Sequence, residues 1–275
     1  MPAADREGPG TDDAALTGAL PGPPVPKAAL VTGGARRIGR ALSLALVEDG
    51  YAVAIHHHHS YQEAEALAAE ITQAGGKAVA LAGDLADEAA VAELLPRATA
   101  VLGPIGCLVN NAAIFENDRV ATATRDSWDR HLAINLRAPF VLMQSFARHL
   151  PEKAGGVIVN LLDERVWNLT PYFVSYTLSK TGLWTLTQTM ALALAPRIRV
   201  NGIGPGPTLP SPRQSARQFL DRCQKMPLRR GTSPDEIAAA LRFILAAPAM
   251  TGQTIALDGG EHLGWAQPGQ GEVVE

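Results

Sequence analysis

Residues 28–39 of this 275-residue chain read AALVTGGARRIG, an apolar run that ends in a glycine-rich turn and leads into a helical pattern. Glycines permit a tight turn and a close backbone approach, while the N-terminus of the following helix presents unpaired amides to a pyrophosphate. Such a stretch can be only a turn, but two adjacent arginines add cations where nucleotide phosphates would lie. The residues expected at the phosphates are Gly33, Arg36, Arg37, Ile38 and Gly39.

Short apolar runs alternate with amphipathic stretches over the rest of the chain, without an internal repeat or a long linker. Strands are predicted at residues 28–32, 52–57, 78–82, 107–110, 156–161, 199–203 and 254–257. The clearest helices are predicted at residues 38–49, 61–74, 126–149 and 174–195. Near-continuous apolar strands separated by helices indicate a parallel sheet covered on both faces, and right-handed crossovers make it doubly wound. We therefore expect a single α/β domain of the Rossmann type over residues 27–264, with seven parallel strands and ligands at their carboxyl ends.

Composition limits the classes of function. An apolar content of 47% and a formal charge of −3 suit one large globular domain. No block of Lys and Arg appears, which argues against nucleic acid as a partner, and no segment approaches the roughly 20 apolar residues of a membrane span. Cys107 and Cys223, far apart in sequence, are expected to be reduced and buried, as in a cytoplasmic protein. Residues 1–26 are expected to be a disordered tail and residues 265–275 a C-terminal tail, because both are rich in Pro and Gly.

Tyr176 and Lys180 form a Y-x-x-x-K pair, whose spacing places both side chains on one face of a helix. The ammonium is expected to lower the pKa of the phenol, and a tyrosine so placed can donate a proton to a substrate heteroatom during hydride transfer. Asp163 follows a predicted strand and is expected to orient the phenol and relay protons. The alternative is an exposed Asp163 that only starts a loop.

The end of the second predicted strand bears on the choice of cofactor. A carboxylate there would bind the ribose 2′-hydroxyl of NAD, but residues 56–60 read HHHHS. Imidazole and hydroxyl donors suit a 2′-phosphate, so we predict NADPH. The alternative for His57 is a surface residue without a functional role. Neighbours on a strand point to opposite faces, so these histidines cannot converge on one ion and no metal is expected. Asp84 and Leu85 are expected to border the adenine, unless Asp84 only caps the next helix. The residues expected at the 2′-phosphate are Arg36, His58, His59 and Ser60.

The chain resembles the short-chain dehydrogenase/reductase family over about residues 27–262. Besides T-G-x-x-x-x-x-G and Y-x-x-x-K, the resemblance rests on NNAA at residues 110–113, NGIGPG at 201–206 and DGG at 258–260. It implies that Lys180 binds the nicotinamide ribose, and that Asn135 helps hold a water that links this lysine to solvent unless it is a plain polar group of the helix. It also implies a homo-oligomer, commonly a tetramer. The further cofactor contacts that it implies are Asn111, Ala112, Ala113, Pro205 and Gly206, of which Ala113 departs from the usual glycine.

Within that family the chain looks most like the pteridine reductases, which include dihydromonapterin and dihydrofolate reductases of this fold. The likeness rests on Arg37 in place of a second glycine, the H-x-H-x-S pattern at residues 56–60, Phe115 after NNAAI, and Asp163 in place of the usual catalytic serine. It implies that Phe115 stacks on a pterin opposite the nicotinamide. It also implies that Arg37 contacts the carbonyl side of the pterin, or only the cofactor phosphate.

The expected activity is NADPH-dependent hydride transfer to a C=N bond of a dihydropterin or dihydrofolate, with the proton supplied by Tyr176 and Asp163. The leading alternative is an NADPH-dependent carbonyl reductase, which shares Tyr176 and Lys180 but uses a serine hydroxyl where Asp163 stands. A non-catalytic NADP-binding sensor is a weaker alternative, because both residues of the Tyr–Lys pair are present. Residues 205–226 are predicted to be a long loop that governs substrate choice. Its arginines are expected either to meet a glutamate tail or to face solvent: Arg213, Arg217 and Arg222.

Overall fold

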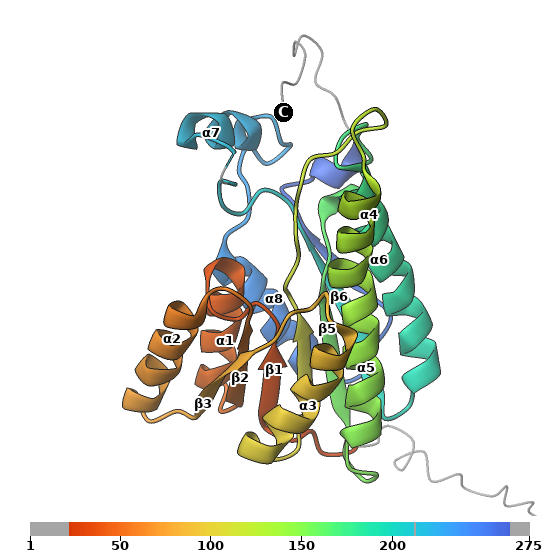
Figure 1. Cartoon of the computed structure of the whole chain (residues 1–275). Helices are drawn as coiled ribbons and strands as arrows, with labels where there is room; N and C mark the ends of the chain where they lie inside the picture. Colours follow the sequence, from red (N-terminus) through yellow and green to blue (C-terminus); the bar gives the residue numbers. More distant parts are fainter. Residues whose placement is uncertain (1–21, 212, 265–275) are drawn as a thin grey trace, which may run out of the picture.

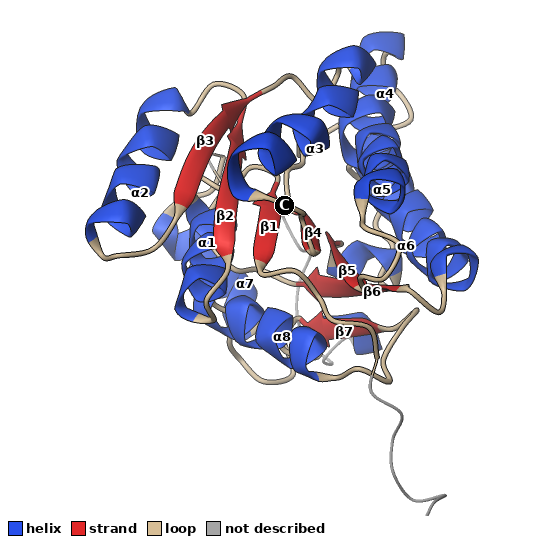
Figure 2. Ribbon diagram, turned by 90° about the horizontal axis from the view of Figure 1, so that it is seen from below, coloured by secondary structure: helices blue, strands red, loops and turns tan. Residues whose placement is uncertain are grey.

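The computed structural model describes residues 22–211 and 213–264, which form one parallel sheet of seven strands with helices on both faces (Figure 1, Figure 2). The strand order is β3-β2-β1-β4-β5-β6-β7. The strands are β1 (Ala28–Val31), β2 (Ala52–His57), β3 (Ala78–Ala82), β4 (Cys107–Asn110), β5 (Gly156–Leu161), β6 (Ile198–Pro205) and β7 (Thr254–Leu257). The predicted doubly wound fold is confirmed. Because the order reverses between β1 and β4, the loops after these strands diverge and open a crevice at the carboxyl edge of the sheet.

Alternate residues of the central strand β1 face two hydrophobic cores. Ala28 and Leu30 belong to the core beneath α3, α5 and α6, whereas Ala29 and Val31 belong to the core beneath α1, α2 and α8. A strand covered on both sides needs apolar residues at successive positions, which explains the continuous run AALV. Figure 2 shows the two helical layers with the sheet between them. The helices of the first layer are α3 (Glu88–Leu102), α4 (Arg125–Leu132), α5 (Ala138–His149) and α6 (Val174–Leu194), and those of the second are α1 (Arg37–Glu48), α2 (Tyr61–Gln73) and α8 (Pro234–Ala246).

The helix predicted over residues 126–149 contains a π-helical turn that the hydrophobic pattern does not show. α4 ends at Leu132, the π-helical segment η2 covers Ala133–Arg137, and α5 begins at Ala138. Asn135 lies at the centre of η2. Such turns occur mostly as single insertions in α-helices and often at functional sites.

Residues 205–226, predicted as one long loop, contain the helix α7 (Ala216–Gln224), so that prediction is wrong for this part. Figure 1 shows α7 above the carboxyl edge of the sheet. Both α7 and α8 begin with a capping box, formed by Ser215 with Gln218 and by Ser233 with Glu236. This spacing of Ser and Gln or Glu was the sequence signal available for both helices.

The folded part of the chain begins before residue 27, the predicted boundary of the domain. Val25 packs against the core beneath α1 and α8, and the carbonyl of Pro24 accepts a hydrogen bond from the amide of Gly155 at 3.0 Å. Residues 1–21 and 265–275, which hold most of the predicted tails, lie outside the described residues. Cys107 and Cys223 are free and buried, as predicted. Within residues 22–211 and 213–264, no helix is long and apolar enough to cross a membrane.

Candidate active site

The loops at the carboxyl edge of the sheet surround a cavity of about 640 Å³. Its lining comes from the turn after β1, the ends of β2, β4, β5 and β6, the helix α6, and the helix α7. Two of the site residues predicted from the sequence, Asp84 and Asn135, lie outside this lining. The predicted residues that line it are Gly33, Arg36, Arg37, Ile38, Gly39, His58, His59, Ser60, Leu85, Asn111, Ala112, Ala113, Phe115, Asp163, Tyr176, Lys180, Pro205 and Gly206.

The turn after β1 requires its glycines. Gly33 has a φ of +59°, in the left-handed region, and a Cβ at Gly39 would overlap the carbonyl oxygen of Gly33. The side chain of Asn111 locks this turn from the end of β4, because its amide donates to the carbonyls of Thr32 (2.8 Å) and Gly33 (3.0 Å). The backbone of the turn is therefore held in place at the N-terminus of α1.

Arg37 links this turn to the segment after β6. Its guanidinium donates hydrogen bonds to the carbonyls of Leu209 (3.3 Å) and Pro210 (3.1 Å). Its φ of +52° is unusual for a residue with a side chain. Arg37 therefore connects the turn after β1 to the segment after β6, and both line the cavity.

The four histidines after β2 divide into two kinds. His56 is buried: its Nδ1 accepts from the amide of Gly33 at 3.1 Å, its Nε2 lies 3.1 Å from the carbonyl of Gly83, and burial lowers its pKa to about 4. His57 is buried too, with its ring edge-on to Tyr61, so the alternative of a surface residue is wrong for it. His58 and His59 are exposed, and their ring centroids lie 3.6 Å apart with the planes tilted by 32°. All four histidines line the cavity, and His58 and His59 are the exposed pair. Among the residues that the structure describes, no group of three His, Cys, Asp or Glu side chains is arranged to hold a metal.

Asp84 stabilises the turn after β3. Its carboxylate accepts from the amide of Ala86 at 2.9 Å and lies 3.9 Å from His58. The alternative that Asp84 caps the next helix is wrong, because Asp87 caps α3 by accepting from Ala89 and Ala90. Leu85 lines the cavity.

The hydroxyl of Tyr176 donates a 2.7 Å hydrogen bond to Asp163. Both Tyr176 and Lys180 are buried on α6, and the ammonium of Lys180 donates to the carbonyl of Leu161 at 2.6 Å. Burial and the adjacent Asp163 raise the pKa of Tyr176 well above its ordinary value, whereas burial lowers the pKa of Lys180 to about 8. The expectation that Lys180 lowers the pKa of the phenol is therefore reversed, because burial and the nearby carboxylate both favour the protonated hydroxyl.

Asn135 bonds to the backbone beside the cavity. Its Oδ1 accepts from the amide of Ile114 (2.9 Å), and its Nδ2 donates to the carbonyl of Ile114 (3.0 Å) and to the hydroxyl of Ser179 (3.1 Å). The side chain thus ties the loop after β4 to α6, which excludes the alternative of a plain polar group on a helix. Asn135 thereby fixes the backbone of Ile114 and the position of the next residue, Phe115.

Phe115 forms part of an aromatic cluster at the start of α6. Its ring stacks on Phe173 at 4.4 Å with an interplanar angle of 8° and meets the ring of Tyr176 edge-on at 4.7 Å. Arg213 donates to the carbonyl of Phe115 at 3.1 Å and lies over its ring, 5.0 Å from the centroid. Arg213 therefore packs on this cluster while it stays exposed to solvent.

Asp118, which the sequence did not single out, caps α6 from outside the helix. The N-cap residue Phe173 has a φ of +57° and supplies no side-chain cap. Asp118 is buried and takes this role, because it accepts from the amide of Ser175 (3.1 Å) and the hydroxyl of Ser127 (2.9 Å). Burial alone would raise the pKa of Asp118, but the hydrogen bonds from Ser175 and Ser127 outweigh it and lower the pKa. The carboxylate of Asp118 therefore stays charged, and it binds Ser175, the residue directly before Tyr176.

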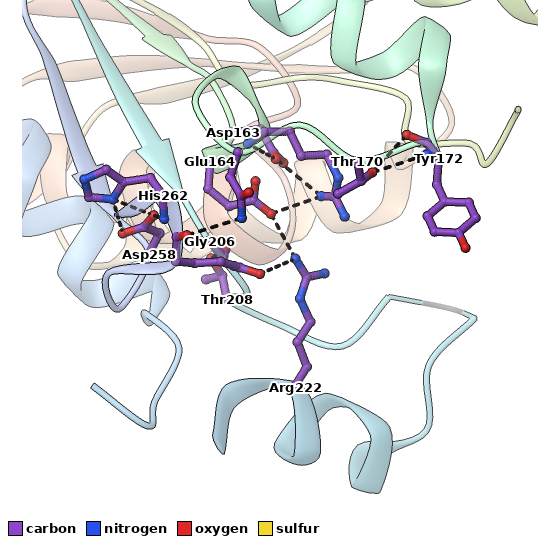
Figure 3. Close-up of polar contacts among 12 residues, drawn as sticks. Asp163, Glu164, Thr170, Tyr172, Gly206, Thr208, Arg222, Asp258 and His262 are labelled. Atoms are coloured by element: carbon purple, nitrogen blue, oxygen red, sulfur yellow. Dashed lines mark hydrogen bonds and ion pairs between the residues drawn. The ribbon is translucent and has the colours of Figure 1, made fainter. Parts of the chain in front are cut away.

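A buried cluster of charges lies directly after Asp163. Glu164 and Arg165 belong to the short helix η3 (Glu164–Val166), and both are buried. Arg222 of α7 extends toward Glu164 (Figure 3). It bridges Glu164 to Glu261 of the short helix η4 (Glu261–Leu263). Burial, followed by the neighbouring Asp163, raises the pKa of Glu164. Arg222 thus does not simply face solvent, unlike Arg217, whose side chain is 92% exposed.

A doubly wound parallel sheet, a glycine-rich first turn and a buried Tyr–Lys pair at the carboxyl edge define a Rossmann-type oxidoreductase. The family model described as short chain dehydrogenase matches residues 27–220, and the chain belongs to this family. The family predicted from the sequence motifs is therefore confirmed.

Solved structures of related proteins agree with this assignment. The crystal structure of FolM alternative dihydrofolate reductase 1 from Brucella canis complexed with NADP is 47% identical, covers 88% of this chain and 96% of that chain, and has a TM-score of 0.85. The FolM structure from Brucella suis in complex with NADP is 48% identical over 87% of this chain and 96% of that chain, with a TM-score of 0.84. Among curated relatives, the 3-oxoacyl-[acyl-carrier-protein] reductase FabG of Staphylococcus epidermidis is 31% identical over 86% of this chain and 99% of that protein.

Proposed function

We propose that this protein is an NADPH-dependent reductase that transfers a hydride to a C=N bond of a dihydropterin or dihydrofolate. The observation that carries the proposal is the 2.7 Å hydrogen bond from Tyr176 to Asp163, beside the ring of Phe115. A carboxylate at this point would repel the negative charge that develops on a carbonyl oxygen during ketone reduction. It is compatible with a ring nitrogen, which gains a proton. The two similar dihydrofolate reductase structures with NADP support the same choice.

The residues around the first turn fit a phosphorylated dinucleotide. The close approach of Gly39 to Gly33 leaves backbone amides free of side-chain bulk at the N-terminus of α1, where a pyrophosphate binds favourably. His58 and His59 face the cavity at the end of β2, where NAD-dependent enzymes carry a carboxylate. NADPH, when bound, supplies the hydride. The residues proposed to hold it are Gly33, Arg36, Arg37, Ile38, Gly39, His58, His59, Ser60, Asp84, Leu85, Asn111, Ala112, Ala113, Tyr176, Lys180, Pro205 and Gly206.

Tyr176 is proposed to deliver the proton that balances the hydride. Its raised pKa keeps the hydroxyl protonated, so the group is a donor at neutral pH. Asp163 fixes the direction of the hydroxyl and can relay a proton taken up from solvent to the phenolate. Lys180, whose ammonium lies 5.8 Å from the centre of the Tyr176 ring, offsets the negative charge left on the phenolate. Phe115, with Arg37, is proposed to hold the flat substrate ring.

A carbonyl reductase is the second candidate, because the 31% identical FabG protein is a 3-oxoacyl reductase. It shares Tyr176 and Lys180 but requires a donor toward the carbonyl oxygen where Asp163 stands. A non-catalytic NADP-binding sensor is less favoured, since the buried Tyr–Lys pair and its carboxylate are assembled. The family resemblance also leads us to propose a cytoplasmic homo-oligomer, a tetramer, whose mass light scattering can measure.

The deciding experiment follows the loss of NADPH absorbance with dihydrobiopterin, dihydromonapterin and dihydrofolate, beside a panel of small ketones. We expect turnover with the pterins or dihydrofolate. In the Asp163→Ala variant, turnover should fall by about 100-fold, the lower range for loss of an assisting acid or base, while the NADPH dissociation constant changes little. Turnover confined to ketones would contradict the proposed function. An equal loss of turnover and of NADPH binding in the variant would contradict it as well.

A further inference from the structure

Arg222 joins three segments that are far apart in the sequence. Its guanidinium donates to Oε1 of Glu164 at 2.9 Å and to Oε1 of Glu261 at 3.1 Å. Figure 3 shows Arg222 extending from α7 toward Glu164, which directly follows Asp163. One side chain of α7 therefore ties this helix to the edge that carries Asp163 and to the last helix of the described chain.

The burial of Glu164 makes this bridge hard to break. Its side chain is 3% exposed, and a buried carboxylate that loses its cation is far more destabilising than a broken surface ion pair. Arg165 is a second cation at this carboxylate, 3.3 Å from it, and also lies 3.4 Å from Asp163. Acidic and basic side chains therefore alternate from Asp163 through Arg165 and Glu164 to Arg222. Displacement of α7 would disturb the carboxylate that accepts from Tyr176.

The helix held by this bridge is part of the wall of the cavity. Phe219 and Arg222 of α7 line it, together with Gln214 just before the helix. On the same helix, Arg217 pairs with Asp221 at 4.0 Å and is largely exposed. The two arginines of this helix thus differ in their partners, since Arg222 binds residues of other elements and Arg217 pairs within α7.

We propose that Arg222 is a positioning residue that fixes α7 as the substrate-side wall of the active site by binding Glu164 and Glu261. The inference rests on the proposed function in one respect, that the substrate occupies the cavity beside Tyr176. Because the residues proposed for the cofactor phosphates lie around α1 and β2, loss of the bridge should weaken substrate binding and leave NADPH binding nearly intact.

The test compares Arg222→Met with the matched control Arg217→Met in the full chain. KM is measured with whichever pterin, folate or ketone the wild type turns over fastest, and the NADPH dissociation constant by fluorescence. Hydrogen exchange of residues 216–224 reports on α7 independently of the substrate. We expect Arg222→Met to raise KM by about tenfold and to speed exchange in α7, with NADPH affinity within about twofold, whereas Arg217→Met resembles the wild type. Arg222→Lys should have a KM between that of Arg222→Met and that of the wild type.

Equal KM and equal exchange in the two Met variants would overturn the proposal, and so would faster exchange without a change in KM. If Arg222→Met does not fold, Glu261→Gln removes one of the two carboxylates that Arg222 binds while Glu164 keeps its cations, and it should shift both readouts in the same direction by a smaller amount. A wild-type enzyme that reduces only ketones would contradict the proposed substrate. The comparison of Arg222 with Arg217 would still decide the role of the bridge.

Discussion

Lys180 is an ammonium almost entirely enclosed by protein. It is 3% exposed, and burial lowers its pKa from 10.5 to about 8. A base with a lower pKa in the folded chain binds fewer protons there than in the unfolded chain, over the interval between the two values. Stability contributed by this residue therefore rises with pH from about 8 to 10.5, and folding works against the charged form below that interval.

We predict a pH-dependent difference between the wild type and Lys180→Met. The free energy of unfolding of the wild type minus that of the variant should increase by about 3 kcal/mol between neutral pH and pH 10.5, since one pKa unit corresponds to about 1.4 kcal/mol. Urea denaturation of both proteins at a series of pH values measures it, and other titrating groups cancel in the difference. A flat difference over this interval would show that the ammonium is not disfavoured by folding.

At the scale of elements, the start of α6 depends on a carboxylate from another loop. Asp118 accepts from the Ser175 amide, and the loop that carries it also presents Phe115 to Phe173. Tyr176 is the next residue after this cap. The orientation of the first turn of α6, and with it the contact of Tyr176 with Asp163, is thus set by residues that are not part of the helix.

Asp118→Ala should lower kcat by about tenfold with a small change in the KM for NADPH, because the first turn of α6 loses its cap and Tyr176 its fixed position. Asp118→Asn keeps an oxygen acceptor and should recover most of kcat. Ser233→Ala is the control, since it removes a side-chain cap from α8 and should reduce stability by about 1 kcal/mol without this loss of kcat. Steady-state kinetics and thermal unfolding of the three variants provide the comparison. Equal kcat in Asp118→Ala and Ser233→Ala would contradict the role.

The elements that could be predicted from the sequence are those encoded by local patterns. The apolar strands, the turn at residues 33–39 and the spacing of Tyr176 and Lys180 each specify a structure within one segment. The π-helical turn at Asn135 could not be predicted in the same way, because it depends on bonds to Ile114 and Ser179 from other segments. The cap that Asp118 provides for α6 could not be predicted either, because it is a contact between distant segments that forms only when the chain folds.

At the scale of the whole molecule, long-range charge pairing was the least predictable feature. The sequence left open whether Arg213 and Arg222 meet a substrate or face solvent. In the structure Arg222 binds Glu164 from the loop after β5, and the exposed Arg213 contacts Phe115 from the loop after β4. Sequence spacing contains no information on such pairs. The charged run Asp163-Glu164-Arg165 directly after an apolar strand was the available signal, because acids and a base held at a buried strand end need partners.

The opposite edge of the sheet offers a test of where the fold begins. Residues 23–26 cross the amino ends of β4 and β5, where Pro24 accepts from Gly155, Val25 packs on the core, and a Cβ at Gly106 would overlap the carbonyl oxygen of Pro26. A chain that starts at residue 27 should therefore be less stable than one that starts at residue 22, by about 1–2 kcal/mol for the lost apolar burial and hydrogen bond.

The substitution Gly106→Ala tests the contact between Gly106 and Pro26. In the chain that starts at residue 22, the added methyl group collides with the backbone of Pro26 and should lower the free energy of unfolding. In the chain that starts at residue 27 that obstacle is gone, so the same substitution should have little effect. Urea denaturation of the four proteins measures the coupling, and kcat should be equal in all four because this edge is opposite the cavity. Equal destabilisation of both chain lengths would mean that residues 23–26 do not hold the position described.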